Sequence, residues 1–253
     1  MKLRLAHFYP DLLNFYEDDG NVFILQEKAE QMGIDFEVTN ISAGDAFDPL
    51  AFDLLFMGGG KDGDQRKVSP DLVKNKKANL IKAIEAGVPM LCICGGYQLM
   101  GKRYLDSTGF EIEGLGILNL ETIAHPERLV GSLEFETTLD LQNKILIGVE
   151  NHGGRTYYCS ESGSANDSEF QFSPGLKSTA CSSPGSGCGS QLKPFGRVIK
   201  GYGNNGDDGT EGAIYKNLIG TYAHGSFLPK NPQMADYLLN LAIERRGLQI
   251  KDK

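Results

Sequence analysis

Residues 88–101 read VPMLCICGGYQLMG, an apolar strand that stops at Cys94 and passes through two glycines into a helical pattern. A sharp strand-to-helix turn is typical of a nucleophile elbow, in which small neighbours accommodate a disfavoured backbone conformation at the nucleophile. We therefore expect Cys94 to be a nucleophile whose thiolate is favoured by the helix N-terminus, with the Gly95 N–H placed to stabilise an oxyanion. Cys92 should point to the opposite side of the strand as a buried apolar residue. The alternative is that Cys94 too is a buried structural thiol.

Upstream of this stretch, apolar runs alternate with amphipathic stretches, which indicates strands joined by helices. The pattern predicts strands at 3–8, 36–38 and 53–57, a helix from about Asn21 to Gly33, and a helix capped by Ser69, with Pro70 in its first turn, that ends near Gly87. This alternation predicts an α/β fold with a mostly parallel central sheet and helices on both faces. Functional residues in such folds lie at the carboxyl ends of the strands, where Cys94 is expected.

Beyond Gly109 the chain changes to short apolar segments separated by glycine and charged turns, which predicts antiparallel strands that extend the same sheet. A final helix is expected with Asn231 as its cap and Pro232 in its first turn. Residues 160–194 are rich in Ser and Gly with few apolar anchors, so we expect a mobile insertion there. The whole chain, 1–253, is thus expected to form a single domain.

The composition limits the classes of partner and the compartment. The chain has 253 residues, 40% hydrophobic and 23% charged, and its formal net charge of -8 argues against nucleic acid or an anionic membrane as the main partner. No uncharged apolar run approaches the roughly 20 residues of a transmembrane helix, and the N-terminus resembles a strand more than a signal peptide, so we expect a cytoplasmic protein. The five cysteines form no paired CxxC motifs, and Cys181 and Cys188 lack a ligand pattern, which predicts neither a disulfide framework nor a metal site.

A second glycine cluster, GGGKDGDQ at 58–65, follows the strand at 53–57 and should therefore lie at the same sheet edge as Cys94. It lacks the GxxxxGK[ST] spacing of a P-loop, and no helix is expected directly after it. We interpret Gly59 and Gly60 as main-chain donors of an oxyanion hole, with a plain turn as the alternative.

A thiol nucleophile needs a base, and His224 is the strongest of the four histidines. It follows the apolar run NLIGTYA and precedes a glycine, so it should lie at the end of a strand beside the elbow. A lone histidine is usually structural or on the surface; only the combination with Cys94 favours catalysis.

Together these residues resemble the class I glutamine amidotransferases, whose elbow reads G-x-C-x-G-x-Q and whose base is a late histidine after a strand. Cys94, Gly96 and Gln98 match that elbow, and Cys92 replaces its first glycine. The form C-G-G-Y-Q with a later A-H-G is similar to the cobyric acid synthase-like branch. Outside 160–194 the chain also resembles the glutaminase subunits of bacterial lipid II isoglutaminyl synthases, through stretches such as ETIAHPERLVG, ENHGGRTY, GYGNNGDDGTEGA and GTYAHGSFLPKNP.

The resemblance implies a flavodoxin-like α/β fold. It also implies hydrolysis of L-glutamine through a Cys94 thioester with His224 as base. It implies a heterodimer with a Mur-ligase-like synthetase that uses the ammonia and ATP to amidate the α-carboxyl of D-glutamate in the lipid II stem peptide, a step of peptidoglycan synthesis. ATP and Mg are expected on that partner, because this chain has no Walker A motif, and no cofactor is expected in this subunit.

The resemblance also suggests which residues contact the substrate: Gly59, Gly60, Gly95, Gln98, Arg128 and His152. The guanidinium of Arg128 is suited to hold the α-carboxylate of glutamine, because its fork binds a carboxylate through two hydrogen bonds. The alternatives are a solvated surface arginine at 128 and a structural histidine at 152.

The chain departs from the class I pattern after its histidine. Many of these enzymes carry a glutamate two residues later that orients the imidazole, whereas this chain reads His224-Gly225-Ser226. The orienting group is then expected elsewhere in the chain, at a main-chain carbonyl or on the partner. Three other functions stay open: the glutaminase part of a cobyrinic or cobyric acid amidating system, a dienelactone-hydrolase-like cysteine hydrolase, and a domain that keeps the fold without activity.

Overall fold

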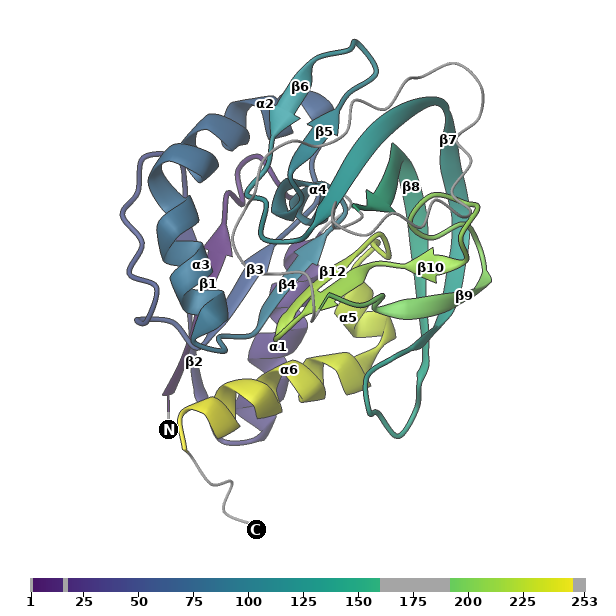
Figure 1. Ribbon diagram of the computed structural model, residues 1–253. Coiled ribbons are helices and arrows are strands. Elements are labelled where there is room, and N and C mark those ends of the chain that lie inside the picture. Colours follow the sequence, from purple (N-terminus) through teal and green to yellow (C-terminus); the bar gives the residue numbers. More distant parts are fainter. Residues whose placement is uncertain (1, 16–17, 160–191, 248–253) are drawn as a thin grey trace, which may run out of the picture.

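A mainly parallel sheet forms the centre of the computed structural model, which describes residues 2–15, 18–159 and 192–247 (Figure 1). Its strands lie in the order β11-β12-β4-β3-β1-β2 and are parallel except for β11, which runs antiparallel to β12. Their bounds are β1 (Lys2–Phe8), β2 (Asp35–Ile41), β3 (Leu54–Met57), β4 (Met90–Ile93), β11 (Ala213–Tyr215) and β12 (Leu218–Thr221). The α/β class predicted from the alternating pattern is confirmed.

Helices cover both faces of this sheet because its strands are apolar on both sides. Alternate side chains of β1, β3 and β4 pack against α1 (Asp19–Gln31) and α6 (Pro232–Arg245), and the intervening ones pack against α3 (Lys77–Glu85) and the π-helix η1 (Leu72–Lys76). Cys92 belongs to the second set and is fully buried, as expected. Cys94 lies beyond the strand and contacts both cores.

The remaining strands form a second, largely antiparallel sheet in the order β10-β9-β7-β5-β6, with β8 paired to β7. Their bounds are β5 (Arg103–Leu105), β6 (Glu111–Glu113), β7 (Leu120–Thr137), β8 (Ile145–Tyr158), β9 (Gly196–Lys200) and β10 (Thr210–Glu211). The expectation that the antiparallel half extends the central sheet therefore holds only for β11. Alternation of apolar and polar residues identifies a half-exposed strand, but it does not say which strand lies next to it.

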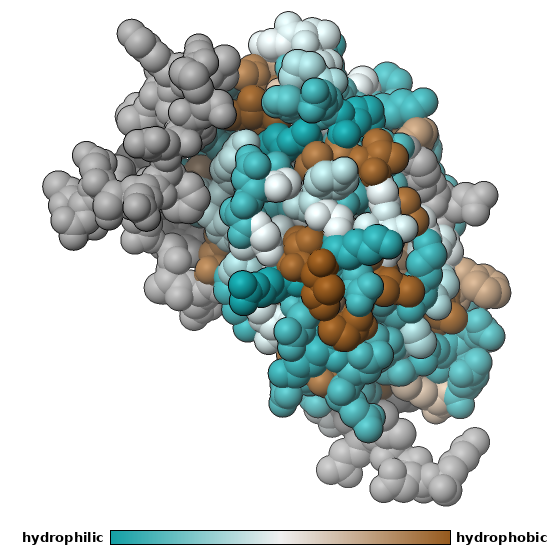
Figure 2. Space-filling model, turned by 90° about the vertical axis from the view of Figure 1, so that its right-hand side faces the viewer, coloured by the Kyte–Doolittle hydropathy of each residue, from teal (hydrophilic) through white to brown (hydrophobic). Residues whose placement is uncertain are grey.

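The outer face of this second sheet carries exposed apolar side chains, visible as a brown group in Figure 2. Exposed apolar residues of β7, β8 and β9 are Val130, Ile145, Ile147, Val149 and Ile199. Within the described ranges, no helix is both long and apolar enough to cross a membrane.

The helix predicted to start at Ser69 begins earlier, so that expectation is wrong. Helix α2 (Asp62–Asp71) starts directly after the glycine cluster, contains Pro70 and continues into η1. The Ser69 hydroxyl donates to the Glu113 main-chain oxygen instead of capping a helix. Proline has no main-chain N–H to donate, so it is common in the first turn of a helix and unfavourable inside one. For this reason Pro70 led to the prediction of a helix start at Ser69.

Other helix ends agree with the sequence pattern. Helix α1 ends before Gly33, which has the left-handed φ of 72°, and α6 begins at Pro232 after Asn231. The short helices α4 (Gly95–Met100) and α5 (Phe227–Lys230) follow the two strand ends that carry Cys94 and His224. The predicted insertion at 160–194 lies outside the described residues except for its last three positions, and Cys181 and Cys188 lie outside them too.

Candidate active site

The carboxyl ends of β3, β4 and β12 border a pocket of about 280 Å³. Most residues that the sequence predicted for the site line this pocket: Gly59, Gly60, Cys94, Gln98, Arg128, His152 and His224. Gly95 does not line it, but its main-chain N–H lowers the pKa of the Cys94 thiol. The structure thus brings together residues that lie up to 165 positions apart in the chain, from 59 to 224.

The backbone of Cys94 has the strain expected of an elbow. Its φ of 46° and ψ of −103° are unusual for a residue with a side chain. The Cys94 N–H donates to the Thr221 oxygen over 2.8 Å, which ties the elbow to β12. A Cβ at Gly96 would lie 2.7 Å from the main-chain oxygens of Met57 and Gly58, so only glycine allows this close approach.

The protonation of Cys94 differs from the sequence expectation. Burial, followed by the charge of Asp18, raises the pKa of the Cys94 thiol to about 12, although the hydrogen bond from Gly95 and the charge of Arg128 lower it. The stabilisation at the N-terminus of α4 is therefore smaller than the desolvation of the thiolate. The resting residue is a protonated thiol that needs a base.

His224 follows β12, the strand that pairs in parallel with β4, and therefore lies at the same edge as Cys94. Its main chain exchanges hydrogen bonds with Val149, at 2.9 and 3.2 Å. Burial, then the electrostatic influence of His152 and Lys230, lowers the pKa of the imidazole to about 4, while the Asn151 main chain raises it. A neutral imidazole at physiological pH is able to accept a proton.

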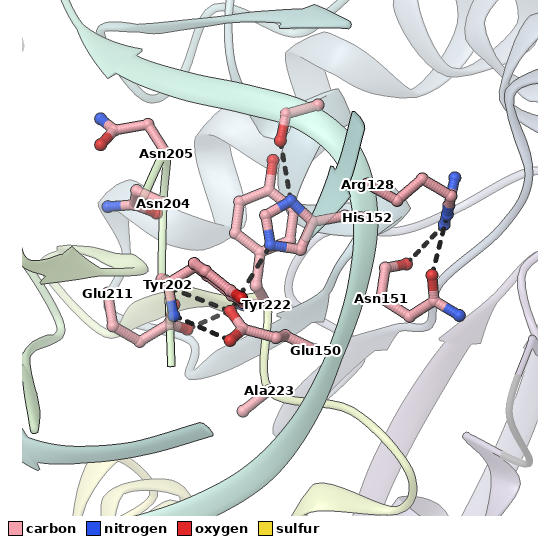
Figure 3. A network of polar contacts seen from close by, with 12 residues as sticks. Arg128, Glu150, Asn151, His152, Tyr202, Asn204, Asn205, Glu211, Tyr222 and Ala223 are labelled. Atoms are coloured by element: carbon pink, nitrogen blue, oxygen red, sulfur yellow. Dashed lines mark hydrogen bonds and ion pairs between the residues drawn. The ribbon is translucent and has the colours of Figure 1, made fainter. Parts of the chain in front are cut away.

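Arg128 lies at the pocket, and its guanidinium holds Asn151 (Figure 3). Its Nε donates to Asn151 Oδ1 over 2.9 Å and its Nη2 donates to the Asn151 main-chain oxygen over 2.7 Å. Although the side chain is exposed, these two bonds fix its direction, which speaks against a freely solvated arginine. Binding of the α-carboxylate stays a prediction.

His152 and Gln98 line the pocket, and contacts with neighbouring residues hold both side chains in place. The His152 ring stacks on Tyr222 with centroids 3.7 Å apart, its Nδ1 bonds the Gly154 oxygen at 2.7 Å, and its Nε2 lies 3.8 Å from Glu150 Oε2 (Figure 3). The Gln98 amide donates to the Tyr222 hydroxyl over 3.1 Å. The stacking and hydrogen bond of His152 support a structural role for this residue. Contacts of His152 and Gln98 with the substrate stay predictions.

Two buried glutamates hold the segments on which His152 and His224 lie. Glu150 accepts hydrogen bonds from the N–H groups of Tyr202 and Gly203, at 2.8 and 2.9 Å (Figure 3). Glu211 Oε1 accepts from the Thr221 hydroxyl at 2.5 Å and from the Tyr222 N–H at 2.8 Å, at the end of β12. Burial raises the pKa of Glu211 to about 7 against the effect of these bonds.

The sequence interpretation missed Asp18, which is fully buried and lines the pocket. Its Oδ2 accepts a hydrogen bond from the Gly59 N–H over 2.6 Å, so the expectation that this N–H is a donor of the oxyanion hole is wrong. The sequence could have pointed to Asp18 through its position after β1 and before α1, because this position lies at the same sheet edge as Cys94. Asn151 and Asp62 also line the pocket and carried no comparable signal. In the part of the chain that the structure describes, His, Cys, Asp and Glu form no group of three or more that could hold a metal.

Comparison with known proteins agrees with this site. A family model for the CobB/CobQ-like glutamine amidotransferase domain matches residues 4–175. Over 252 residues the chain is 38% identical to the lipid II isoglutaminyl synthase (glutamine-hydrolyzing) subunit GatD of Staphylococcus aureus (strain N315), which covers 100% of this chain and 89% of that protein. The subunit of the same name from Streptococcus pneumoniae (strain ATCC BAA-255 / R6) is 32% identical over 246 residues, with 97% and 82% covered.

Among solved structures, a chain of PurLQS from Thermotoga maritima has a similar fold, with a TM-score of 0.59 over 96% of this chain and 99% of that chain. Its identity of 14% makes this a likeness of fold alone. The family match covers more than half of the chain and the first relative covers all of it. The chain therefore belongs to the CobB/CobQ-like glutamine amidotransferase family and is a glutamine amidotransferase.

Proposed function

We propose that this chain is the glutaminase subunit of a lipid II isoglutaminyl synthase. It would hydrolyse L-glutamine through a Cys94 thioester and pass ammonia to a Mur-ligase-like, ATP-dependent partner, which amidates the α-carboxyl of D-glutamate in the lipid II stem peptide. The observation that carries the proposal is the strained Cys94 in one pocket with His224, on a chain similar along its whole length to subunits of that name. The partner and the acceptor rest on this similarity.

The chemistry follows from the two shifted groups. Neutral His224 takes the proton of the Cys94 thiol as sulfur attacks the side-chain carbonyl carbon of glutamine. The oxyanion that forms is held by the N–H of Gly95 and by an N–H of the loop after β3. The imidazolium then returns the proton to the leaving nitrogen, so ammonia departs and a glutamyl thioester remains, which water hydrolyses to glutamate and the free thiol.

Arg128 is suited to recognise the amino-acid end of the substrate. Its Nε and Nη2 are held by Asn151, which is next to His152 in the chain, and a Cβ at Gly153 would lie 3.5 Å from its Nη1. A guanidinium fixed in this way presents a directed positive charge at the pocket, where a carboxylate makes strong hydrogen bonds. The reacting amide would then extend from Arg128 toward Cys94.

The test uses the full chain with its Mur-ligase-like partner and two cysteine variants. In Cys94→Ala, amidation with glutamine should fall by roughly 10³-fold or more, whereas amidation with added ammonium should continue, because only the thioester step is lost. Cys92→Ala is the matched control, since that thiol is buried two residues away on the other side of β4. It should keep most activity.

Several outcomes would contradict the proposal. If Cys92→Ala and Cys94→Ala exchanged phenotypes, the assignment of the elbow would be wrong. Ammonia release that never leads to amidation of the stem peptide would point to another acceptor, such as a cobyrinic or cobyric acid precursor. Release of no ammonia with or without the partner would indicate a fold kept without glutaminase activity.

A further inference from the structure

The loop after β3 is held from two sides at its first peptide plane, which joins Gly58 and Gly59. The Gly58 oxygen accepts a hydrogen bond from the Gly96 N–H over 3.1 Å, and the Gly59 N–H donates to Asp18 Oδ2 over 2.6 Å. The Asp18 side chain is fully buried, so water does not compete for this bond. The orientation of this plane therefore depends on the elbow on one side and on Asp18 on the other.

The next peptide plane joins Gly59 and Gly60. Its oxygen accepts a hydrogen bond from the Phe15 N–H over 2.9 Å. In a planar trans peptide the N–H points away from the oxygen, so the Gly60 N–H points away from Phe15. A Cβ at Gly95 would lie 2.8 Å from the Gly60 nitrogen, which places this nitrogen against the start of α4. No described residue accepts a hydrogen bond from the Gly60 N–H.

The carboxyl group of Asp18 also lies beside the nucleophile. A Cβ at Gly59 would be 3.3 Å from Asp18 Oδ2 and 3.3 Å from Cys94 Cβ. Burial raises the pKa of Asp18 to about 7, and after burial its charge is the next cause that raises the pKa of Cys94. Asp18 thus acts on the site in two separable ways, as a hydrogen-bond acceptor for the loop and as a charge near sulfur.

We propose that Asp18 is a positioning residue that locks the Gly58–Gly59 peptide plane and so directs the Gly60 N–H, together with the Gly95 N–H, at the carbonyl oxygen of glutamine on Cys94. The inference rests on the proposed glutaminase reaction and adds to it the residue that sets the geometry of the oxyanion hole. An unheld loop would turn its donors away, and a displacement of about 1 Å in such a group lowers rates by roughly 10²-fold.

Two substitutions separate the acceptor from the charge. Asp18→Asn keeps an oxygen that accepts from the Gly59 N–H and removes the charge, whereas Asp18→Ala removes both. Glutaminase kcat and KM are measured for the full chain with and without the synthetase-type partner. Asp18→Ala should lower kcat by roughly 10²-fold and leave KM within about threefold, because a misdirected donor weakens the transition state more than the bound substrate. Asp18→Asn should keep kcat within about threefold of wild type.

A second readout follows the charge and does not require turnover. Alkylation of Cys94 by iodoacetamide should be faster in both variants than in wild type at about pH 8, where Asp18 is mostly ionised and disfavours the thiolate. The difference should shrink at about pH 6, where the wild-type carboxyl is mostly protonated. Asp35→Asn is the control, because this carboxylate at the start of β2 is exposed and should change neither readout by more than about twofold.

The outcomes are distinguishable. A wild-type kcat in Asp18→Ala overturns the inference, and so does an Asp18→Asn variant as inactive as Asp18→Ala, since that result would assign the effect to charge or proton transfer. Circular-dichroism melting identifies a variant that fails to fold, and Asp18→Leu, which is close to asparagine in size but has no acceptor, then replaces Asp18→Ala in the comparison. A Cys94→Ala variant that still releases ammonia would instead refute the proposed reaction itself.

Discussion

Cys94 and His224 occupy one pocket with pKa values shifted in opposite directions, to about 12 and about 4. Both shifts have burial as their largest cause, and electrostatic interactions add to them: that of Asp18 with the thiol, and those of His152 and Lys230 with the imidazole. Proton transfer from sulfur to nitrogen is therefore unfavourable in the resting chain. A group that raises the pKa of His224 or lowers that of Cys94 would make this transfer more favourable.

At the same scale, Arg128→Lys tests recognition of the substrate carboxylate. A lysine keeps the charge but loses the fork that Asn151 orients, so ground-state and transition-state binding should weaken together. We expect KM for glutamine to rise by about 10-fold or more, with kcat within about twofold. Steady-state glutaminase kinetics provide the measurement. Arg103→Lys, on β5 and paired with Glu111 and Glu121, is the control; an unchanged KM in Arg128→Lys would exclude the clamp.

At the scale of elements, the site is made by strand ends that touch through glycine. The elbow after β4 packs on the loop after β3 at a distance that leaves no room for a side chain at position 96. The strand β12, which leads to His224, is tied to the second sheet by Glu211 of β10. The geometry of the pocket therefore depends on contacts between elements that are distant in the sequence.

Gly96→Ala should disturb the elbow, because the new Cβ would meet the main-chain oxygens of Met57 and Gly58 at 2.7 Å and neither can move alone. We expect a loss of about 1–3 kcal/mol in the free energy of unfolding and a fall of roughly 10²-fold in glutaminase kcat. Gly131→Ala on β7 is the control, because a Cβ there meets no atom within 4 Å, and its stability should stay within about 0.5 kcal/mol of wild type. The free energy of unfolding is measured by urea unfolding and kcat by glutaminase assays of both variants. Equal values for Gly96→Ala and Gly131→Ala would contradict close packing at the elbow.

Glu211 gives a prediction about stability and pH. Its pKa in the folded protein, about 7, exceeds its ordinary value of 4.5, so the folded state holds the proton more tightly than the unfolded state. The resulting contribution to stability is complete below about pH 4.5 and is lost as pH rises through 7, by up to about 1.4 kcal/mol per pH unit. Glu211→Gln has no proton to lose. Its free energy of unfolding relative to wild type should therefore increase between about pH 5 and pH 8, measured by urea unfolding, and parallel curves would show that Glu211 stays charged in the fold.

At the scale of the whole molecule, His224 is not followed two residues later by the glutamate of many class I enzymes, and the nearby cations Lys230 and Arg128 lower its pKa. The Asn151 main chain raises the pKa of His224, but it supplies no negative charge to stabilise an imidazolium. An acidic group on a docked partner would raise the pKa of His224 and make it a stronger base. Such an arrangement would limit hydrolysis of glutamine when no acceptor is ready.

We therefore expect the isolated chain to be a weak glutaminase and the complex to be much faster. Loss of an orienting acid lowers the rate of a serine protease triad by about 10⁴-fold, which sets the upper size of the effect. The measurement is kcat/KM for ammonia release by the chain alone and with its partner. Equal values would indicate that the groups already present, Asn151 included, are sufficient.

The sequence alone determined the α/β class, the elbow and its two glycines, and the placement of Cys94 and His224 at one sheet edge. These are local properties: runs of apolar residues, strand-to-helix breaks and residues that follow strand ends. Tertiary structure decided which strands pair, since most antiparallel strands form a second sheet, and it decided the start of α2, where Pro70 misled the local pattern. It also decided protonation and the place of Asp18 against the Gly59 N–H, because burial and contacts between distant segments set these and no local pattern encodes them.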